Sequence, residues 1–148
     1  MARDVTLRLP DETAARLEAA ARKEGRSLSE TGARSIEEWL RLNEFPEIEF
    51  RTFNGERHAC VKGFMQIWQL VMVARGWDLD VKTTAKYFPI PEYRIQGAFD
   101  YYRAYPEEID RVIAENEAIT FEDIKRVLPH ANLITVQLDP DDDEELVF

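Results

Sequence analysis

The sequence predicts a mainly α-helical protein with short β segments, arranged in two folded parts. Most of its apolar residues recur at helical spacing, whereas strand-like alternation is confined to short stretches. An Asn54-Gly55 pair marks a β-hairpin. Pro46 separates this hairpin from two helices that precede it. The length of 148 residues allows one medium domain or two small ones.

Composition and charge restrict the class of protein. Hydrophobic residues make up 45% of the chain and no apolar run approaches the roughly 20 residues that span a bilayer. Cys60 is the single cysteine, and the N-terminus lacks the apolar core of a signal peptide, so we expect a cytoplasmic protein without a membrane partner. The net charge of −10 argues against a uniformly basic surface, but six acidic residues fall in 139–148. The remainder is close to neutral and has room for a local basic face.

The first part, residues 1–45, predicts one strand and two helices. Residues 4–9 alternate apolar and polar side chains, and Pro10 ends that stretch. A helix follows and closes at Gly25, and Ser27 with Glu30 has the spacing of a capping box for a second helix. These elements are too few to bury a core alone. Two copies would pair their strands antiparallel and share one core of four helices.

A β-hairpin and a series of helices are predicted after Pro46. The predicted strand pairs are Phe53–Glu56, Phe50–Ala59 and Ile48–Val61. The further predicted elements are a buried helix over 64–74 that ends before Gly76, a helix-turn-helix over 81–105 with Asp80 as cap, a helix over 106–118, a short helix after Thr120, and a strand over 132–138. The aromatic residues assigned mainly to the core are Trp68, Trp77, Tyr87, Phe88, Tyr101, Tyr102 and Tyr105.

Residues 4–43 resemble the ribbon-helix-helix (CopG/Arc/MetJ-like) family, through VTLRLP, the Gly25 turn and SLSE. Thr31-Gly32 departs from the pattern, because bulky apolar residues are common there. The resemblance implies a homodimer whose two-stranded ribbon enters the major groove of operator DNA. It places Asp4, Thr6 and Arg8 toward the groove and Ser27 and Ser29 at the phosphate-binding start of the second helix. With the basic residues Arg3 and Arg26, these form the candidate DNA-binding set.

The residue types in this first part suit DNA recognition. Arg8 can donate two hydrogen bonds to guanine, and Thr6 can reach base edges or a thymine methyl group. Ser27 and Ser29 lie at a helix N-terminus, which is an anion site, and Arg26 adds positive charge beside it. An ordinary solvated strand face and plain helix capping are the alternative interpretations.

Residues 47–118 resemble a winged-helix domain of VapB-type antitoxins, through VKGFMQIWQLV and YFPIPEYRIQGAFDYYRAYPEEIDRVIAENE; WDLDVKTT departs from that pattern. The resemblance implies a PIN-like ribonuclease toxin as partner. The second group of candidate binding residues is Lys82, Thr83, Lys86, Arg94 and Gln96. Because Glu92 and Asp100 share the second helix, a role in partner binding or dimerisation is favoured over DNA binding.

Catalysis finds little support in the sequence. His58 and His130 are the only histidines, and no nucleophile, phosphate-loop or metal-ligand motif is present. His58 and Cys60 share a strand face but have no third group to orient them. We therefore expect no enzyme activity, no catalytic residue, no metal and no cofactor.

The sequence thus predicts an N-terminal ribbon-helix-helix domain (1–45), a winged helix-turn-helix domain (46–130), and a short strand with an acidic tail (131–148). The tail has three interpretations: a solvated end, a segment that docks on a basic partner, or a competitor of DNA for the ribbon. The expected function is that of an antitoxin that represses its own operon and neutralises a PIN-like ribonuclease. The alternatives are a stand-alone transcriptional regulator and an oligomerisation or adaptor module without DNA binding.

Overall fold

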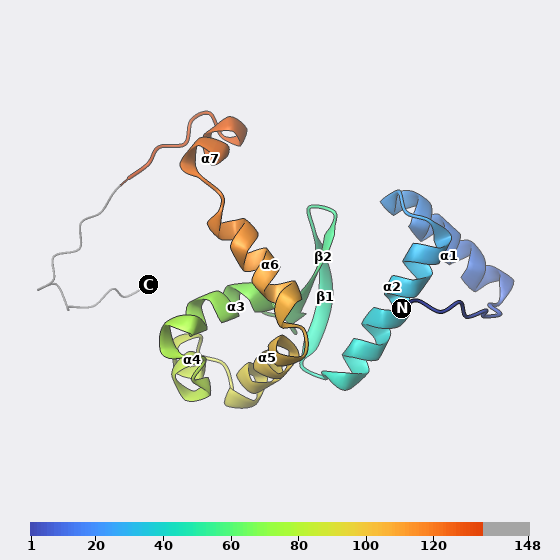
Figure 1. Ribbon diagram of the computed structural model, residues 1–148, viewed down its shortest axis with the longest axis horizontal. Coiled ribbons are helices and arrows are strands. Elements are labelled where there is room, and N and C mark those ends of the chain that lie inside the picture. The colour runs from blue at the N-terminus through green and yellow to red at the C-terminus, as the bar shows by residue number, and fades with distance from the viewer. Residues whose placement is uncertain (135–148) are drawn as a thin grey trace, which may run out of the picture. The chain divides into compact units, whose positions relative to one another are not determined.

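The computed structural model describes residues 1–134 (Figure 1). Over these residues the protein is mainly helical with one small antiparallel sheet, as the sequence predicts. The chain forms two compact units, residues 1–113 and 114–148, which are described separately. The boundaries expected at residues 45 and 130 remain a prediction from the sequence pattern.

Two helices form the N-terminal part, preceded by ten residues that adopt neither helix nor strand within a single chain. Helix α1 spans Asp11–Glu24 and helix α2 spans Leu28–Glu44. Gly25 ends α1 in the left-handed conformation (φ 65°), which glycine adopts without steric cost. The predicted capping box starts α2 and is confirmed: the Glu30 backbone N–H donates to the Ser27 hydroxyl at 3.1 Å.

The hairpin has the predicted register. Strands β1 (Ile48–Phe53) and β2 (Glu56–Val61) pair antiparallel. The pairs are Ile48–Val61, Phe50–Ala59 and Phe53–Glu56 among others, as predicted. Asn54 (φ 50°) and Gly55 (φ 81°) both take positive φ, which is the geometry of a two-residue hairpin turn.

Helix α3 spans Ile67–Ala74, so it begins three residues later than predicted. The delay has a backbone cause. The Val61 N–H donates to the Met65 carbonyl at 3.0 Å, and Gln66 bridges back to Cys60, which holds the preceding residues in a turn. The helix ends at Ala74, before Gly76, as predicted, and a separate 3₁₀ turn, η1 (Arg75–Trp77), follows it.

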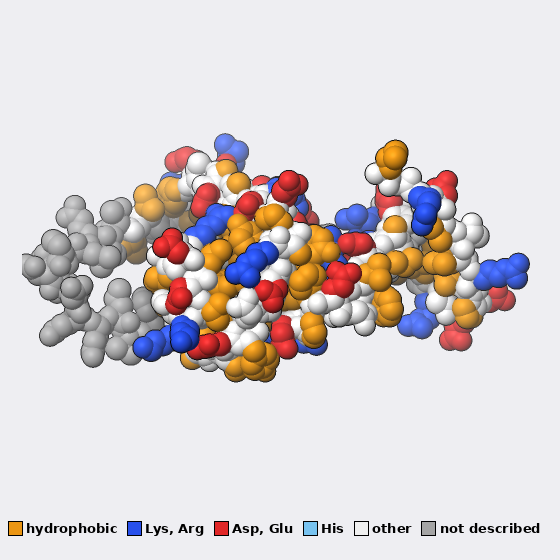
Figure 2. Space-filling model, turned by 60° about the horizontal axis from the view of Figure 1, so that its bottom comes forward, with side chains coloured by type: hydrophobic (Ala, Val, Ile, Leu, Met, Phe, Trp, Pro, Cys, Tyr) orange, Lys and Arg blue, Asp and Glu red, His pale blue; other side chains and the backbone are white. Residues whose placement is uncertain are grey.

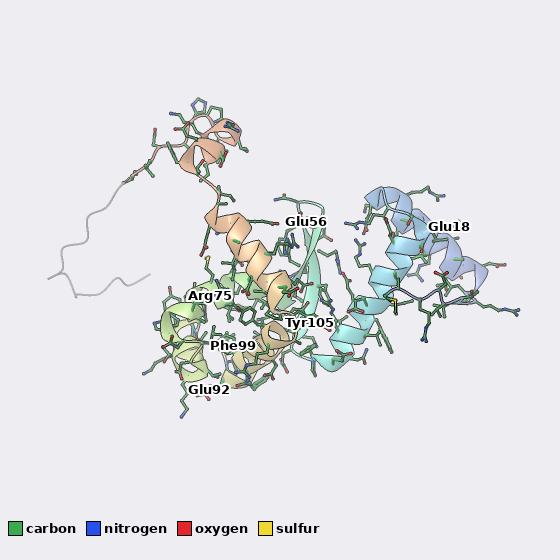
Figure 3. The ribbon with its side chains drawn as sticks, in the orientation of Figure 1. Glu18, Glu56, Arg75, Glu92, Phe99 and Tyr105 are labelled. Atoms are coloured by element: carbon green, nitrogen blue, oxygen red, sulfur yellow. The ribbon has the colours of Figure 1, made fainter. Side chains whose placement is uncertain are left out.

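The remaining helices of the first unit enclose one core. They are α4 (Val81–Tyr87), α5 (Glu92–Ala104) and α6 (Pro106–Glu117), whose last four residues belong to the second unit. Asp80 caps α4 as predicted, accepting from the Thr83 N–H at 2.8 Å. The largest fully buried side chains include Tyr101, Phe99, Ile48, Ile67, Leu70 and Ile95 (Phe99 is labelled in Figure 3). Tyr87 is 60% exposed, so its assignment to the core was wrong: it packs on the edge of Phe88 at the surface.

A close backbone approach within the first unit escaped the sequence analysis. A Cβ atom at Gly97, on α5, would lie 2.8 Å from the Cβ of Glu47. Real Cβ atoms do not come that close, so this position of α5 requires glycine. The sequence gives no sign of it, because the contact joins residues that are fifty positions apart.

In the second unit, helix α7 spans Phe121–Val127 and is capped by Thr120, as predicted. The described part of the predicted strand, residues 132–134, adopts no strand, since no neighbouring segment pairs with it. The rest of that strand (135–138) and the acidic tail (139–148) lie outside the described residues.

Candidate functional sites

The N-terminal part exposes an unusual amount of apolar side chain. Trp39 is 63% exposed and Leu7 is 58% exposed. The other exposed large apolar residues of this part are Met1, Val5, Leu9, Leu28, Ile36, Leu40 and Leu42. Hydrophobic side chains can be seen at the surface of this part, among charged ones, in Figure 2. Contiguous apolar surface of this kind marks a binding interface in a water-soluble protein.

Most of these residues line one open groove of about 820 Å³, here called the N-terminal groove. Its apolar lining comprises Val5, Leu7, Leu9, Leu17, Leu28, Ala33, Ile36 and Trp39. Gly32 also lies in the lining, and a Cβ there would meet only Leu17, at 3.7 Å. No contact with the described part of the chain therefore explains this glycine, and the groove is open beside it.

The first group of sequence-predicted site residues lies around this groove. Arg3, Asp4 and Ser29 contribute to its lining, whereas Thr6 and Arg8 are exposed and absent from it. Strand alternation predicts that Asp4 shares a face with Thr6, opposite to Val5. In the single chain, Asp4 and Val5 both line the groove.

The N-terminus of α2 is capped by Ser27 and has the positively charged side chain of Arg26 next to it. The Ser27 hydroxyl is engaged by the Glu30 N–H, while the N–H groups of the first turn have no acceptor inside the helix. Arg26 lies 4.0 Å from Glu24. The predicted cap is therefore present and a cationic side chain adjoins it.

The second group of predicted site residues falls into two sets, one on α4 and one on α5, which make different contacts. Lys82, Thr83 and Lys86 line a shallow surface depression of α4, with Pro91 and Glu92. Thr83 also donates its hydroxyl hydrogen to Asp80 at 2.6 Å.

The two members of that group on α5 make contacts within the chain. Arg94 donates to the backbone carbonyl of Lys62 in the turn after the hairpin. Gln96 donates to Asp100 at 2.8 Å. The Arg94 bond joins α5 to the turn after the hairpin, whereas the Gln96 bond lies within α5 at i,i+4 spacing, which the helical pattern makes recognisable.

A polar network joins α2 to α5 and α6. The Arg41 guanidinium donates to Glu37 at 2.9 Å, to the Tyr101 hydroxyl at 2.8 Å and to Glu108 at 3.0 Å. Tyr101 in turn donates to Glu108 at 2.6 Å, and Arg41 lies 3.7 Å from the ring centroid of Tyr105. Such a charge-assisted network fixes the contact between these helices.

Burial and partners shift the pKa values of this network in a consistent direction. Burial, followed by the hydrogen bond that Tyr101 donates to the Glu108 carboxylate, raises the pKa of Tyr101 far above its usual range. Burial alone would lower the pKa of Arg41, but the hydrogen bond to Glu37 and the interaction with Tyr101 outweigh it, so the pKa is raised. Tyr101 therefore stays neutral and Arg41 stays charged at any physiological pH.

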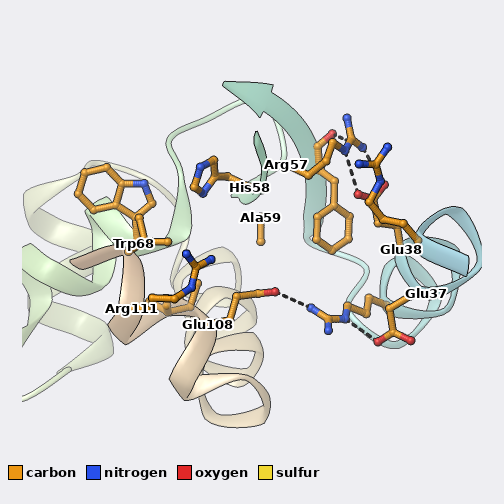
Figure 4. Close-up of a pocket in the computed structure, with 13 residues that line it drawn as sticks. Glu37, Glu38, Arg57, His58, Ala59, Trp68, Glu108 and Arg111 are labelled. Carbon is orange, nitrogen blue, oxygen red and sulfur yellow. Dashed lines mark hydrogen bonds and ion pairs between the residues drawn. The ribbon is translucent and has the colours of Figure 1, made fainter. Parts of the chain in front are cut away.

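A pocket of about 200 Å³ lies between α2, the hairpin and α6 (Figure 4). Phe50, Trp68 and Val112 supply part of its apolar wall. Arg57 reaches from β2 to Glu38 on α2 with two hydrogen bonds of 2.8 Å each. This bidentate ion pair holds the hairpin against α2.

The structure gives no chemical support to a Cys60–His58 pair. Cys60 is fully buried, and its thiol lies 3.5 Å from the backbone carbonyl of His58, not from the imidazole. Burial raises the pKa of this thiol, which disfavours the reactive thiolate. Among residues 1–134, no group of three or more His, Cys, Asp or Glu side chains is placed to hold a metal ion. None of the helices in this range is long and apolar enough to cross a membrane.

No family model, curated protein or solved structure matches this chain.

Proposed function

We propose that this protein is a cytoplasmic antitoxin that binds operator DNA as a homodimer and neutralises a PIN-like ribonuclease. The observation that carries the proposal is the uncovered N-terminal groove. Val5, Leu7 and Leu9 line it together with apolar residues of α2, and a single chain leaves them largely exposed. A second copy is the occupant that fits this groove best.

The case for a second copy rests on the elements that the chain itself offers. Residues 4–9 have strand-like alternation and no strand partner among residues 1–134. The same segment of another copy would provide that partner and would cover both grooves at once through a two-fold axis. Gly32 supports the docking, because the groove beside it has room for a close approach. Thr6 and Arg8 would then lie on the outer face of the ribbon.

We expect Arg8→Ala to weaken operator binding while leaving the dimer intact. A good bidentate contact between arginine and guanine contributes about 1–3 kcal/mol, and a dimer loses two such contacts. The measurement is DNA binding by fluorescence anisotropy across a range of salt concentrations, with sedimentation to check the dimer. Arg103→Ala, on α5 and exposed, is the matched control.

Three results of that titration would be informative. A steep decline of affinity with salt for the natural chain is expected, because several phosphates are neutralised per dimer. A flat response, or an Arg8→Ala variant that binds like the control, would contradict DNA recognition by the ribbon. A dimer without any DNA binding would favour the adaptor module.

The second unit supplies support for a protein partner. Its exposed large apolar residues are Ile119, Ile124, Val127, Leu128, Leu133 and Ile134. Six acidic residues follow this segment, in the last ten positions of the sequence. An apolar segment followed by dense negative charge suits a partner with an apolar groove and a basic rim. We assign this segment, residues 119–134, to the ribonuclease.

This assignment predicts that Val127→Asp releases the ribonuclease from inhibition. The gene adjacent to that of this protein should encode the nuclease, and the two chains are co-expressed and purified. Val127 is 80% exposed, so its replacement leaves the fold of the free protein intact. Ala19→Asp, on the exposed side of α1, introduces the same charge elsewhere.

The readout is cleavage of RNA by the nuclease at a fixed ratio of the two chains. We expect the natural chain and Ala19→Asp to inhibit cleavage and Val127→Asp to inhibit it at least tenfold less. Equal inhibition by all three would remove the segment 119–134 from the interface. An adjacent nuclease that cleaves RNA equally well with and without the natural chain would contradict the antitoxin proposal itself.

A further inference from the structure

Helix α2 has two opposite sides that contact different parts of the protein. One side is apolar and lines the N-terminal groove through residues that include Ile36 and Trp39. Arg34, Glu38 and Arg41 are spaced by four and then three residues, so they share the other side of the helix. We call these three residues the charged face of α2. One helix thus connects the proposed dimer interface with a second set of contacts.

Two residues of the charged face pair with elements that follow α2 in the chain. Arg57 on β2 donates two hydrogen bonds of 2.8 Å each to Glu38, and Arg41 donates to Glu108 on α6 at 3.0 Å (Figure 4). The side chain of Glu38 is 18% exposed and that of Arg41 is 16% exposed, so salt screens these pairs less than it screens surface pairs. The hydrogen bond to Glu38 raises the pKa of Arg57, so this pair stays charged. Both pairs fasten α2 to the part of the unit that holds the core.

The two N-terminal helices have little packing of their own. Ala21 is the one buried residue of α1, and Thr31 is the one buried residue of α2. Helices of 14 and 17 residues are only marginally stable in water when no apolar face is covered. The helical order of α2 therefore depends on partners for its two sides. A second copy would supply the partner of the apolar side, and the hairpin and α6 supply partners of the charged face.

We infer that Glu38, through its ion pair with Arg57, is a positioning residue for dimerisation and acts by ordering α2. The inference rests on the proposed function, because the second copy occupies the apolar side of the same helix. The ion pair and the second copy both stabilise helical α2, so each favours the other. Without the pair, dimerisation alone must supply the free energy that orders the helix, and the dimer becomes weaker. The coupling is reciprocal, so the dimer in turn stabilises the hairpin.

The test compares Glu38→Arg with Glu44→Arg. The first variant breaks the ion pair and faces Arg57 with a second positive charge, while it changes no residue of the hydrophobic core. The control makes the same charge reversal at an exposed residue of the same helix. A third variant, Glu38→Arg/Arg57→Glu, restores opposite charges at the two positions. Urea unfolding followed by circular dichroism verifies that the core of each variant is folded.

The first measurement is the dissociation constant of the dimer, from sedimentation over a range of protein concentrations. Loss of a charged, hydrogen-bonded pair weakens an equilibrium about tenfold, and a dimer contains two such pairs, so Glu38→Arg should raise the dissociation constant about a hundredfold. Glu44→Arg should dimerise like the natural chain. Glu38→Arg/Arg57→Glu should recover most of the lost affinity, because it re-forms the pair with the charges exchanged. Such recovery distinguishes a specific pair from a general loss of stability.

The second measurement is hydrogen exchange of the hairpin amides, which reports local opening. It is made at protein concentrations above and below the dissociation constant of each variant. In the natural chain and in Glu44→Arg, the β2 amides around Arg57 should exchange more slowly in the dimer, because an ordered α2 holds that strand. In Glu38→Arg, the same amides should exchange equally fast in monomer and dimer. A purely structural role of Glu38 would not produce this dependence on concentration.

The outcomes separate this inference from the proposed function. A natural chain that is monomeric at every concentration overturns the homodimer and the role of Glu38 together. A natural dimer that is equally stable in Glu38→Arg and Glu44→Arg overturns the role of Glu38 while the homodimer stands. The same holds if the charge exchange recovers no affinity, or if hairpin exchange in the natural chain is the same in monomer and dimer.

Discussion

Leu7→Asp is expected to convert the dimer into a monomer at concentrations where the natural chain is dimeric. Burial of one leucine side chain contributes about 1.5–3 kcal/mol. The dimer contains two copies, so the loss is about 3–6 kcal/mol and the dissociation constant should rise at least a hundredfold. A buried, unpaired carboxylate adds a further cost. Analytical ultracentrifugation over a range of protein concentrations measures the change.

Val127→Asp is the matched control for dimerisation, because it makes the same kind of change at an exposed residue of the second unit. It should sediment like the natural chain. The circular dichroism of Leu7→Asp should show that α1 and α2 lose helicity as the dimer dissociates, since a single copy buries few of their side chains. A monomeric natural chain, or an equally stable Leu7→Asp dimer, would contradict the proposed N-terminal interface.

Tyr101→Ala is expected to lower the free energy of unfolding by about 3–5 kcal/mol, the range for removing a large buried aromatic side chain. Tyr101 is fully buried, and its ring lies 5.3 Å from that of Phe45 and 6.3 Å from that of Phe50, measured between centroids. Its hydroxyl also connects Arg41 with Glu108. The substitution therefore leaves a cavity and breaks the network between α2, α5 and α6. Urea unfolding followed by circular dichroism gives the difference.

Tyr93→Ala on the same helix provides the comparison, because Tyr93 is 62% exposed and its loss should cost less than about 0.5 kcal/mol. Tyr101→Phe separates the ring from the hydroxyl and should cost about 2 kcal/mol, because the hydroxyl makes two hydrogen bonds that each contribute about 1 kcal/mol. If Tyr101→Ala were no more destabilising than Tyr93→Ala, Tyr101 would not be part of the core.

Features that depend on neighbours in the sequence were predicted well. The turn at Gly25, the capping box of Ser27 and the hairpin register around Asn54-Gly55 all follow from short-range conformational preferences. The start of α3 was placed too early, because its position depends on the Gln66–Cys60 bridge as well as on the apolar run. The apolar pattern begins three residues before the helix and therefore could not give its start.

The candidate sites were only partly predictable. The exposed apolar side of the N-terminal part follows from its pattern, because too few apolar residues are available to cover it. The partner of Arg94, the Lys62 carbonyl, is identified only in three dimensions, whereas the i,i+4 spacing of Gln96 and Asp100 on a predicted helix already indicated a contact. Nothing in the sequence indicated that Arg57 and Arg111 line the same pocket, because a single basic residue on a strand or a helix usually points into solvent.

The sequence by itself thus determined the helices, the hairpin, their caps and the surplus of apolar surface at the N-terminus, because each follows from local geometry and residue composition. The tertiary structure alone decided that Gly97 adjoins Glu47, that Arg41 meets Tyr101 and Glu108, and that arginines from separate elements surround one pocket. The residues in these contacts are brought together by the packing of the core, and no periodicity along the chain encodes a meeting between distant positions.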